Sequence, residues 1–175
     1  MEVRVGRRQL LVGVALVAFG VVMRLVPHPA NFAPVGAIAL FGGAIFGKRY
    51  GWWLPVVVMM ISDLYLGFYS SMPFTWAAYA LIGLIGVSMK RWHGWWRVPV
   101  GSAASSLTFF AVSNFGVWIN GGLYAHTWSG LVQCFTLALP FFRPTVVSDL
   151  VFSGIFFGVY ALAARLAAVP LSLEQ

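Results

Sequence analysis

Apolar runs follow one another along the whole chain and are separated only by short polar breaks. Of the 175 residues, 61% are hydrophobic and only 9% are charged. An ordinary soluble domain has about 25% charged residues, so this chain cannot cover a surface that faces water. The pattern therefore predicts one integral membrane domain over residues 1–175, with no room for a separate soluble domain.

A helix that crosses a membrane needs about 20 apolar residues. By this measure the chain contains five strong or short segments, then a weaker one, then a last strong one. They lie at 9–26, 35–47, 51–68, 74–89, 99–118, 127–142 and 145–168. The weak segment 127–142 contains Gln133, Thr136 and Pro140, so we expect a re-entrant or surface helix there. The predicted fold is an all-α bundle of six transmembrane helices with this extra short helix, and seven spans is the alternative.

The basic residues lie at the ends of these segments rather than on one face. They form three groups, which are Arg4, Arg7 and Arg8, then Lys48 and Arg49, then Lys90, Arg91 and Arg97. This is the positive-inside pattern, so the net charge of +7 indicates topology and not a nucleic-acid partner. It predicts a cytoplasmic N-terminus and places the loops with His28, Tyr69 and Tyr124 outside.

Two acidic residues, Asp63 and Asp149, lie inside apolar stretches in the same tripeptide, Ser-Asp-Leu, whereas Glu2 and Glu174 lie near the ends. A carboxylate at membrane depth costs about 2.5–3.5 kcal/mol, so it normally has a partner and often a function. Two interpretations stay open. Each aspartate pairs with Arg24, Arg143 or a helix terminus, or it binds a cation or a polar group of a substrate.

Polar and aromatic residues gather in the outer loops. The first loop, 27–34, contains three prolines and is therefore stiff, and a second polar stretch covers 113–126. Asn and His beside aromatic rings suit a small planar or heterocyclic ligand, although an aromatic belt at the membrane interface is the alternative for the Trp and Tyr residues. The candidate substrate-binding residues are His28, Asn31, Phe32, Asp63, Tyr69, Asn114, Trp118, Asn120, Tyr124, His126 and Asp149.

The three histidines share no metal-ligand spacing, and we expect the single cysteine, Cys134, to be a packed small residue. No metal site, cofactor or catalytic residue is therefore predicted. Small residues recur at four-residue spacing at Ala39, Gly43 and Gly47, and again at Gly154 and Gly158. They predict close helix packing inside one bundle, and an interface for a partner membrane protein is the alternative.

Three stretches, at 31–43 (beginning Asn-Phe-Ala-Pro), 113–118 and 139–142, resemble a family of uncharacterised small bacterial membrane proteins with a suspected role in transport. More distantly, the order of a short glycine-rich helix, a basic turn and a helix ending in Ser-Asp-Leu is similar to the S components of energy-coupling factor vitamin transporters. That resemblance implies a six-helix bundle with Asn31, Tyr69 and Asn120 near a ligand at the outer face. It also implies an energising transporter module as a partner, but the first helix lacks the Ala-x-x-x-Ala spacing used for docking.

The leading prediction is a non-enzymatic transport protein of the bacterial cytoplasmic (inner) membrane. It binds a small polar or heterocyclic, vitamin-like solute in a cavity that is open to the outer side. A structural or assembly subunit of a larger membrane complex is the first alternative. A solitary cobalamin transporter and an intramembrane aspartyl enzyme are the others, but the chain has no cysteine near the third outer loop for the first and no Gly-x-Gly-Asp block for the second.

Overall fold

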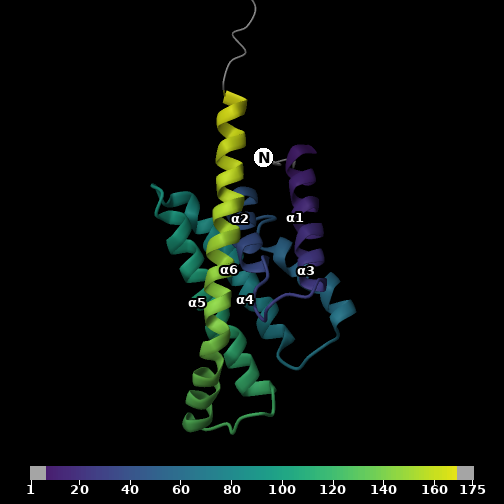
Figure 1. Ribbon diagram of the computed structural model, residues 1–175, viewed down its shortest axis with the longest axis vertical. Helices are drawn as coiled ribbons and strands as arrows, with labels where there is room; N and C mark the ends of the chain where they lie inside the picture. The colour runs from purple at the N-terminus through teal and green to yellow at the C-terminus, as the bar shows by residue number, and fades with distance from the viewer. Residues whose placement is uncertain (1–6, 169–175) are drawn as a thin grey trace, which may run out of the picture.

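The computed structural model describes residues 7–168, and in this range every regular element is helical. Figure 1 shows the arrangement. The elements are α1 (Arg7–Leu25), α2 (Val35–Phe46), α3 (Trp53–Leu66), α4 (Met72–Ser88), the 3-10 turn η1 (Met89–Arg91), α5 (Arg97–Asn120) and α6 (Trp128–Ala168). Arg4 of the first basic group, and the terminal acids Glu2 and Glu174, lie outside the described range.

The first five predicted segments correspond to α1 through α5, with each boundary displaced by two residues or fewer. Glycine ends two of these helices. Gly47 follows α2 with φ 74° and Gly67 follows α3 with φ 93°, a backbone region in which a side chain is strained. The prediction of an all-helical fold is therefore confirmed.

The prediction of a separate re-entrant or short helix at 127–142 is wrong. This stretch and the last predicted segment form one continuous helix of 41 residues, α6, with Pro140 and Pro144 inside it. Each proline removes the backbone hydrogen bond to the carbonyl four residues earlier, a loss that membrane helices tolerate. Thr136 and Thr145 donate to the carbonyls of Val132 and Phe141, at 2.7 Å and 2.9 Å, which are not the carbonyls that the prolines leave unpaired. The prolines lie inside a continuous helix and did not mark a break.

The centre of the bundle is α2, which contacts every other long helix. All its residues from Val35 to Gly43 are buried, as expected for a helix that is apolar on all sides. It contributes one or more residues to each of three core clusters. Leu40 shares a cluster with Ile82, Ile38 shares one with Leu16, and Val35 shares one with Val58. This short helix is therefore enclosed by the others.

Glycines allow α2 and α4 to approach very closely. A Cβ atom added at Gly43 would overlap the backbone carbonyl oxygen of Gly83, and one added at Gly86 would overlap that of Leu40. The prediction of tight packing is confirmed for the small residues of α2. It is wrong for Gly154 and Gly158 of α6, since both are exposed and a Cβ added at either would meet no atom within 4 Å.

Three helical stretches, Met72–Arg91, Arg97–Asn120 and Trp128–Ala167, are long and apolar enough to cross a membrane. The remaining helices of the described part are apolar but shorter. Large apolar side chains are exposed over the outside of the bundle, for example Leu64, Tyr65 and Trp128 at 70%, 76% and 78%. A monomeric soluble protein rarely exposes such a surface, whereas a lipid-facing surface is expected to do so.

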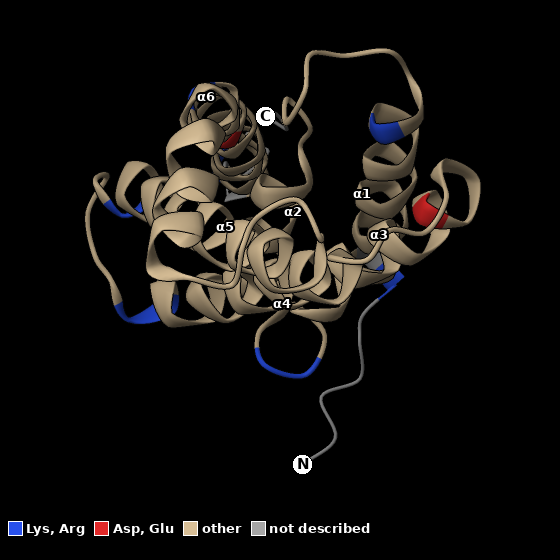
Figure 2. Cartoon of the chain, turned by 90° about the horizontal axis from the view of Figure 1, so that it is seen from below, with Lys and Arg blue, Asp and Glu red and all other residues tan. Residues whose placement is uncertain are grey.

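The charges follow the connections between helices. Figure 2 shows Lys and Arg mostly in the loops and at helix ends, whereas the acidic residues of the described range lie on α6 and α3. Lys90, Arg97 and Arg165 line a single groove at one end of the bundle. The side chains that border the cavity described below come instead from the loops and helix halves of the opposite end.

Candidate functional site

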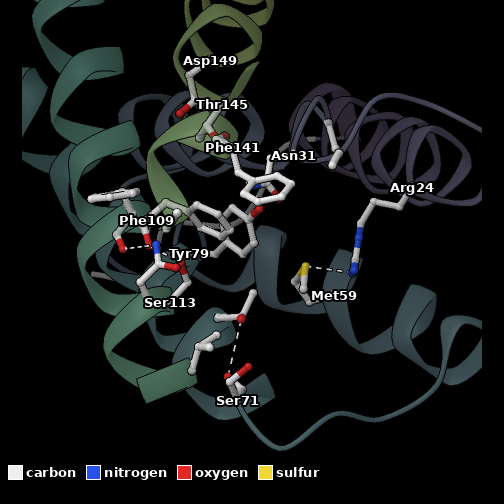
Figure 3. Close-up of a pocket in the computed structure, with 18 of the residues that line it drawn as sticks. Arg24, Asn31, Met59, Ser71, Tyr79, Phe109, Ser113, Phe141, Thr145 and Asp149 are labelled. Carbon is white, nitrogen blue, oxygen red and sulfur yellow. Dashed lines mark hydrogen bonds between the residues drawn. The ribbon is translucent and has the colours of Figure 1, made fainter. Parts of the chain in front are cut away.

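A cavity of about 440 Å³ lies between the α1–α2 loop, the α3–α4 loop and the facing halves of α4, α5 and α6. This volume is within the usual range for small-molecule sites. Figure 3 shows Asp149 and Thr145 on one side of it, Ser71 on the opposite side, and Tyr79 and Phe141 in the middle. The cavity therefore combines polar groups with aromatic rings, and one of the membrane-depth aspartates belongs to its wall.

Asp149 supplies the carboxylate of the cavity. Its side chain is 3% exposed, and the hydroxyl of Ser106 on α5 donates to its Oδ2 at 2.7 Å. Its Oδ1 packs against Gly36 in the first turn of α2, where any larger residue would overlap it. A helix N-terminus favours a negative charge. Within residues 7–168 this carboxylate forms no ion pair, so it can accept a hydrogen bond or a positive charge from a ligand.

Asp63 is held differently. Its Oδ1 lies 2.9 Å from a guanidinium nitrogen of Arg24, in an ion pair that lacks the geometry of a directed hydrogen bond. The indole nitrogen of Trp76 donates to Oδ2 at 2.8 Å, and Arg24 also donates to Ser62 Oγ at 2.6 Å. Asp63 is fully buried and lies outside the cavity wall, whereas Arg24 borders the cavity. The pairing interpretation with Arg24 is confirmed for Asp63.

The proline-containing loop covers one side of the cavity. Asn31 has a positive φ of 61°, a conformation that asparagine tolerates better than most residues. Its amide donates to the Phe141 carbonyl at 3.4 Å, and the hydroxyl of Ser148 donates to the Ala33 carbonyl at 3.0 Å. Both contacts tie the loop to α6. His28 borders the cavity too, with its Nδ1 2.7 Å from the Val26 carbonyl oxygen.

Asn114 and Tyr69 complete the predicted residues that line the cavity. The amide nitrogen of Asn114 donates to the Phe110 carbonyl at 2.7 Å. The backbone carbonyl of Asn114 accepts a hydrogen bond from the buried Cys134 thiol at 3.4 Å, which confirms Cys134 as a packed residue. Partial burial raises the pKa of the Tyr69 hydroxyl above its usual value of 10.0, so this group is a neutral hydrogen-bond donor at physiological pH.

Six predicted site residues lie elsewhere, with Asp63 among them. The ring of Phe32 packs on that of Phe152 in α6 at 5.9 Å. Trp118 donates to the Ala125 carbonyl at 2.9 Å and contacts the ring of His126, so both residues close the α5–α6 loop. Asn120 and Tyr124 belong to the end of α5 and to the same loop, and neither borders the cavity. Loop membership alone did not distinguish a side chain that faces the cavity from one that packs on its own loop.

Sequence reasoning missed several residues of the wall. Tyr79, Phe109 and Phe141 bring rings to the cavity, and Thr75 and Thr145 bring hydroxyls. These residues lie inside apolar helices, where nothing in the local sequence separates an inward side chain from a lipid-facing one. One available signal was spacing, since Phe141, Thr145 and Asp149 recur every four residues and so share one face of α6.

No group of three or more His, Cys, Asp or Glu side chains that could hold a metal ion occurs in the described part of the chain.

The comparisons with known proteins give one match. A family model covers residues 5–170, which is nearly the whole chain, and its description is a family of unknown function, DUF6580. The chain belongs to this family. No curated protein and no solved structure matches the chain. The family has no assigned activity, so the geometry of the cavity is the basis for a function.

Proposed function

We propose that this protein binds a small polar or heterocyclic solute in the cavity and carries it across a membrane. In this proposal the N-terminus lies in the cytoplasm, the helices form a six-span bundle in a bacterial inner membrane, and the cavity opens to the other side. The observation that carries the proposal is Asp149, a buried carboxylate in a cavity wall without a basic partner among the described residues. Such a charge at membrane depth is normally retained for a function.

The wall favours one class of solute. Asp149 suits a cationic or hydrogen-bond-donating group, such as an amine or an amino-substituted ring. Asn31 and Asn114 add amides, and the rings of Tyr79 and Phe141 provide apolar surface against which a planar group can stack. A vitamin-like heterocycle that carries an amino group combines both requirements, and a volume of about 440 Å³ accommodates a molecule of that size.

The test begins with purified full-length protein and a thermal-unfolding screen of amino-substituted heterocycles, vitamins and nucleobases. We expect at least one compound to raise the melting temperature, because a ligand that binds only the folded state stabilises it. Asp149→Asn should weaken the binding of that compound by about tenfold to a hundredfold, since a hydrogen bond to a charged group contributes about 1.5–3 kcal/mol. The change is nearly isosteric, so the fold should survive it.

His126→Gln provides the matched control, because His126 is a polar residue of the outer loops that does not border the cavity. It should leave the binding of the compound unchanged. Folded protein that responds to no compound in the screen, and that takes up none of them in vesicles, would refute the proposal. Equal losses in the Asp149→Asn and His126→Gln variants would show that the binding site is not the cavity.

An assembly subunit of a larger membrane complex is the second candidate. It is favoured by an apolar groove of about 700 Å³ between α1 and α3, lined by residues such as Val14, Val17 and Leu54. Another membrane helix could fill this groove. Co-purification of a partner in fixed stoichiometry, together with no ligand response in the screen, would select this function over solute binding.

A further inference from the structure

The end of the bundle opposite the cavity contains a second hollow, which we call the basic groove. It has a volume of about 870 Å³ and lies between α6, the C-terminal end of α2, the η1 region and the start of α5. Its cations are Lys90, Arg97 and Arg165, with His93 beside them. The proposed function makes no use of this groove.

The charge of the groove is uncompensated in the described part of the chain. Lys90, Arg97 and Arg165 form no ion pair there, and the acidic residues of that part, Asp63 and Asp149, are not in the groove wall. All three cationic side chains are exposed. Three cations from different helices that converge on one hollow create a strong attraction for an anion.

The rest of the wall is apolar. Ile45, Val98 and Phe157 line it, and along α6 it is open because Gly154 and Gly158 have no side chains to fill it. Trp95 at its edge is 86% exposed, which is typical of a tryptophan at the level of lipid headgroups. A free inorganic anion would leave this apolar wall uncovered, whereas a lipid acyl chain would cover it.

We infer that the basic groove binds one anionic phospholipid, with the phosphate on Lys90, Arg97 and Arg165 and an acyl chain along Gly154 and Gly158. Basic pockets between membrane helices on the cytoplasmic side are suited to such headgroups. The occupant is a lipid and not free phosphate, because only a lipid matches both the cationic and the apolar parts of the wall.

The test is native mass spectrometry of the full-length protein with dioleoylphosphatidylglycerol and, in parallel, dioleoylphosphatidylcholine. These lipids share their acyl chains and differ in net headgroup charge. We expect the anionic lipid to bind at least about tenfold more tightly, since each cation near a membrane surface contributes measurably to the attraction. Equal binding of the two lipids would overturn the inference.

Two variants locate the site. The triple change Lys90→Gln, Arg97→Gln and Arg165→Gln should reduce binding of the anionic lipid by about tenfold to a hundredfold. The control triple, Arg7→Gln, Lys48→Gln and Arg49→Gln, removes the same charge outside the groove wall and should change it by less than about threefold. An equal loss in both triples would show that the attraction is general and would overturn the site.

Gly158→Leu tests the apolar half without altering charge. Because a side chain at this position meets no neighbouring atom, the fold should be preserved, while the leucine would occupy the path of the acyl chain. We expect weaker binding of the anionic lipid. Unchanged binding would contradict the inference, and so would displacement of the lipid by millimolar inorganic phosphate, which would indicate a free-anion site. The comparison of the two lipids and this variant decide the matter even if the groove triple does not fold.

Discussion

Replacing Arg24 by Gln leaves the buried carboxylate of Asp63 without its positive partner. Asp63 is fully buried, and the Arg24 guanidinium at 2.9 Å is its positive partner. Removing one member of a buried ion pair typically costs about 3–5 kcal/mol. The adjacent cavity can admit water, so we expect a loss near the lower end, about 3 kcal/mol, in the free energy of unfolding. Reversible unfolding of the purified protein in mixed micelles, titrated with a denaturing detergent, measures this loss.

The matching change, Asp63→Asn, should cost less, about 1–2 kcal/mol, because the stranded Arg24 side chain is 15% exposed and can reach water through the cavity. In the double variant the two polar amides can pair, so its loss should be smaller than the sum of the single losses by at least about 2 kcal/mol. Hydrogen bonds between membrane helices average about 0.6 kcal/mol and reach about 1.7 kcal/mol, so a coupling above that limit identifies an ion pair.

The control for this cycle is Arg49→Gln, in which the arginine is exposed and lies over the ring of Tyr50 at 5.3 Å. It should cost less than about 1 kcal/mol, the value of an exposed cation–π contact. Additive losses for Arg24→Gln and Asp63→Asn, within about 0.5 kcal/mol, would refute the ion pair between α1 and α3.

Three further changes test the approach of α2 to α4 and the hydrogen bond to Asp63. Gly43→Ala should lower the free energy of unfolding by about 1–3 kcal/mol, because the new Cβ meets the Gly83 carbonyl oxygen. Gly154→Ala places its Cβ in open space and should be neutral or slightly stabilising. Equal effects of the two alanines would contradict the close approach of α2 and α4. Trp76→Phe removes the donor to Asp63 Oδ2 and should lower the free energy of unfolding by about 1–3 kcal/mol. Unfolding in mixed micelles measures this loss as well. A neutral result would mean that this hydrogen bond is not formed.

The first five helices could be predicted from the sequence because each of their apolar runs is bounded by a physical stop. Gly47 and Gly67 end helices through positive φ, and basic turns separate other helices. The predicted ends of these five helices therefore lie within two residues of the observed ones. The region around Pro144 was misjudged for a related reason. A proline usually ends or kinks a helix in water, but membrane helices tolerate proline, and α6 continues through both Pro140 and Pro144.

The candidate site was predictable only in part. Asp149 stood out because a carboxylate is costly in an apolar run, and Asn31 because it lies in a stiff loop; both border the cavity. The different situations of Asp63 and Asp149 could not be foreseen, because their tripeptides are identical and the difference comes from Arg24, Trp76 and Ser106 on other helices. Tertiary contacts decide which of two similar residues is available to a ligand.

The length of α6 has a consequence for how the protein sits in its surroundings. At 1.5 Å per residue its 41 residues extend for about 60 Å, roughly twice the hydrocarbon thickness of a bilayer. Even a tilt of about 40°, the steepest commonly seen, brings only some 26 residues into the hydrocarbon and leaves about 15 beyond it. Figure 1 shows the C-terminal part of α6 rising past the other helices. In a bilayer, about 15 residues of α6 therefore lie outside the lipid tails, at one or both of its ends, and are open to proteases or to soluble neighbours.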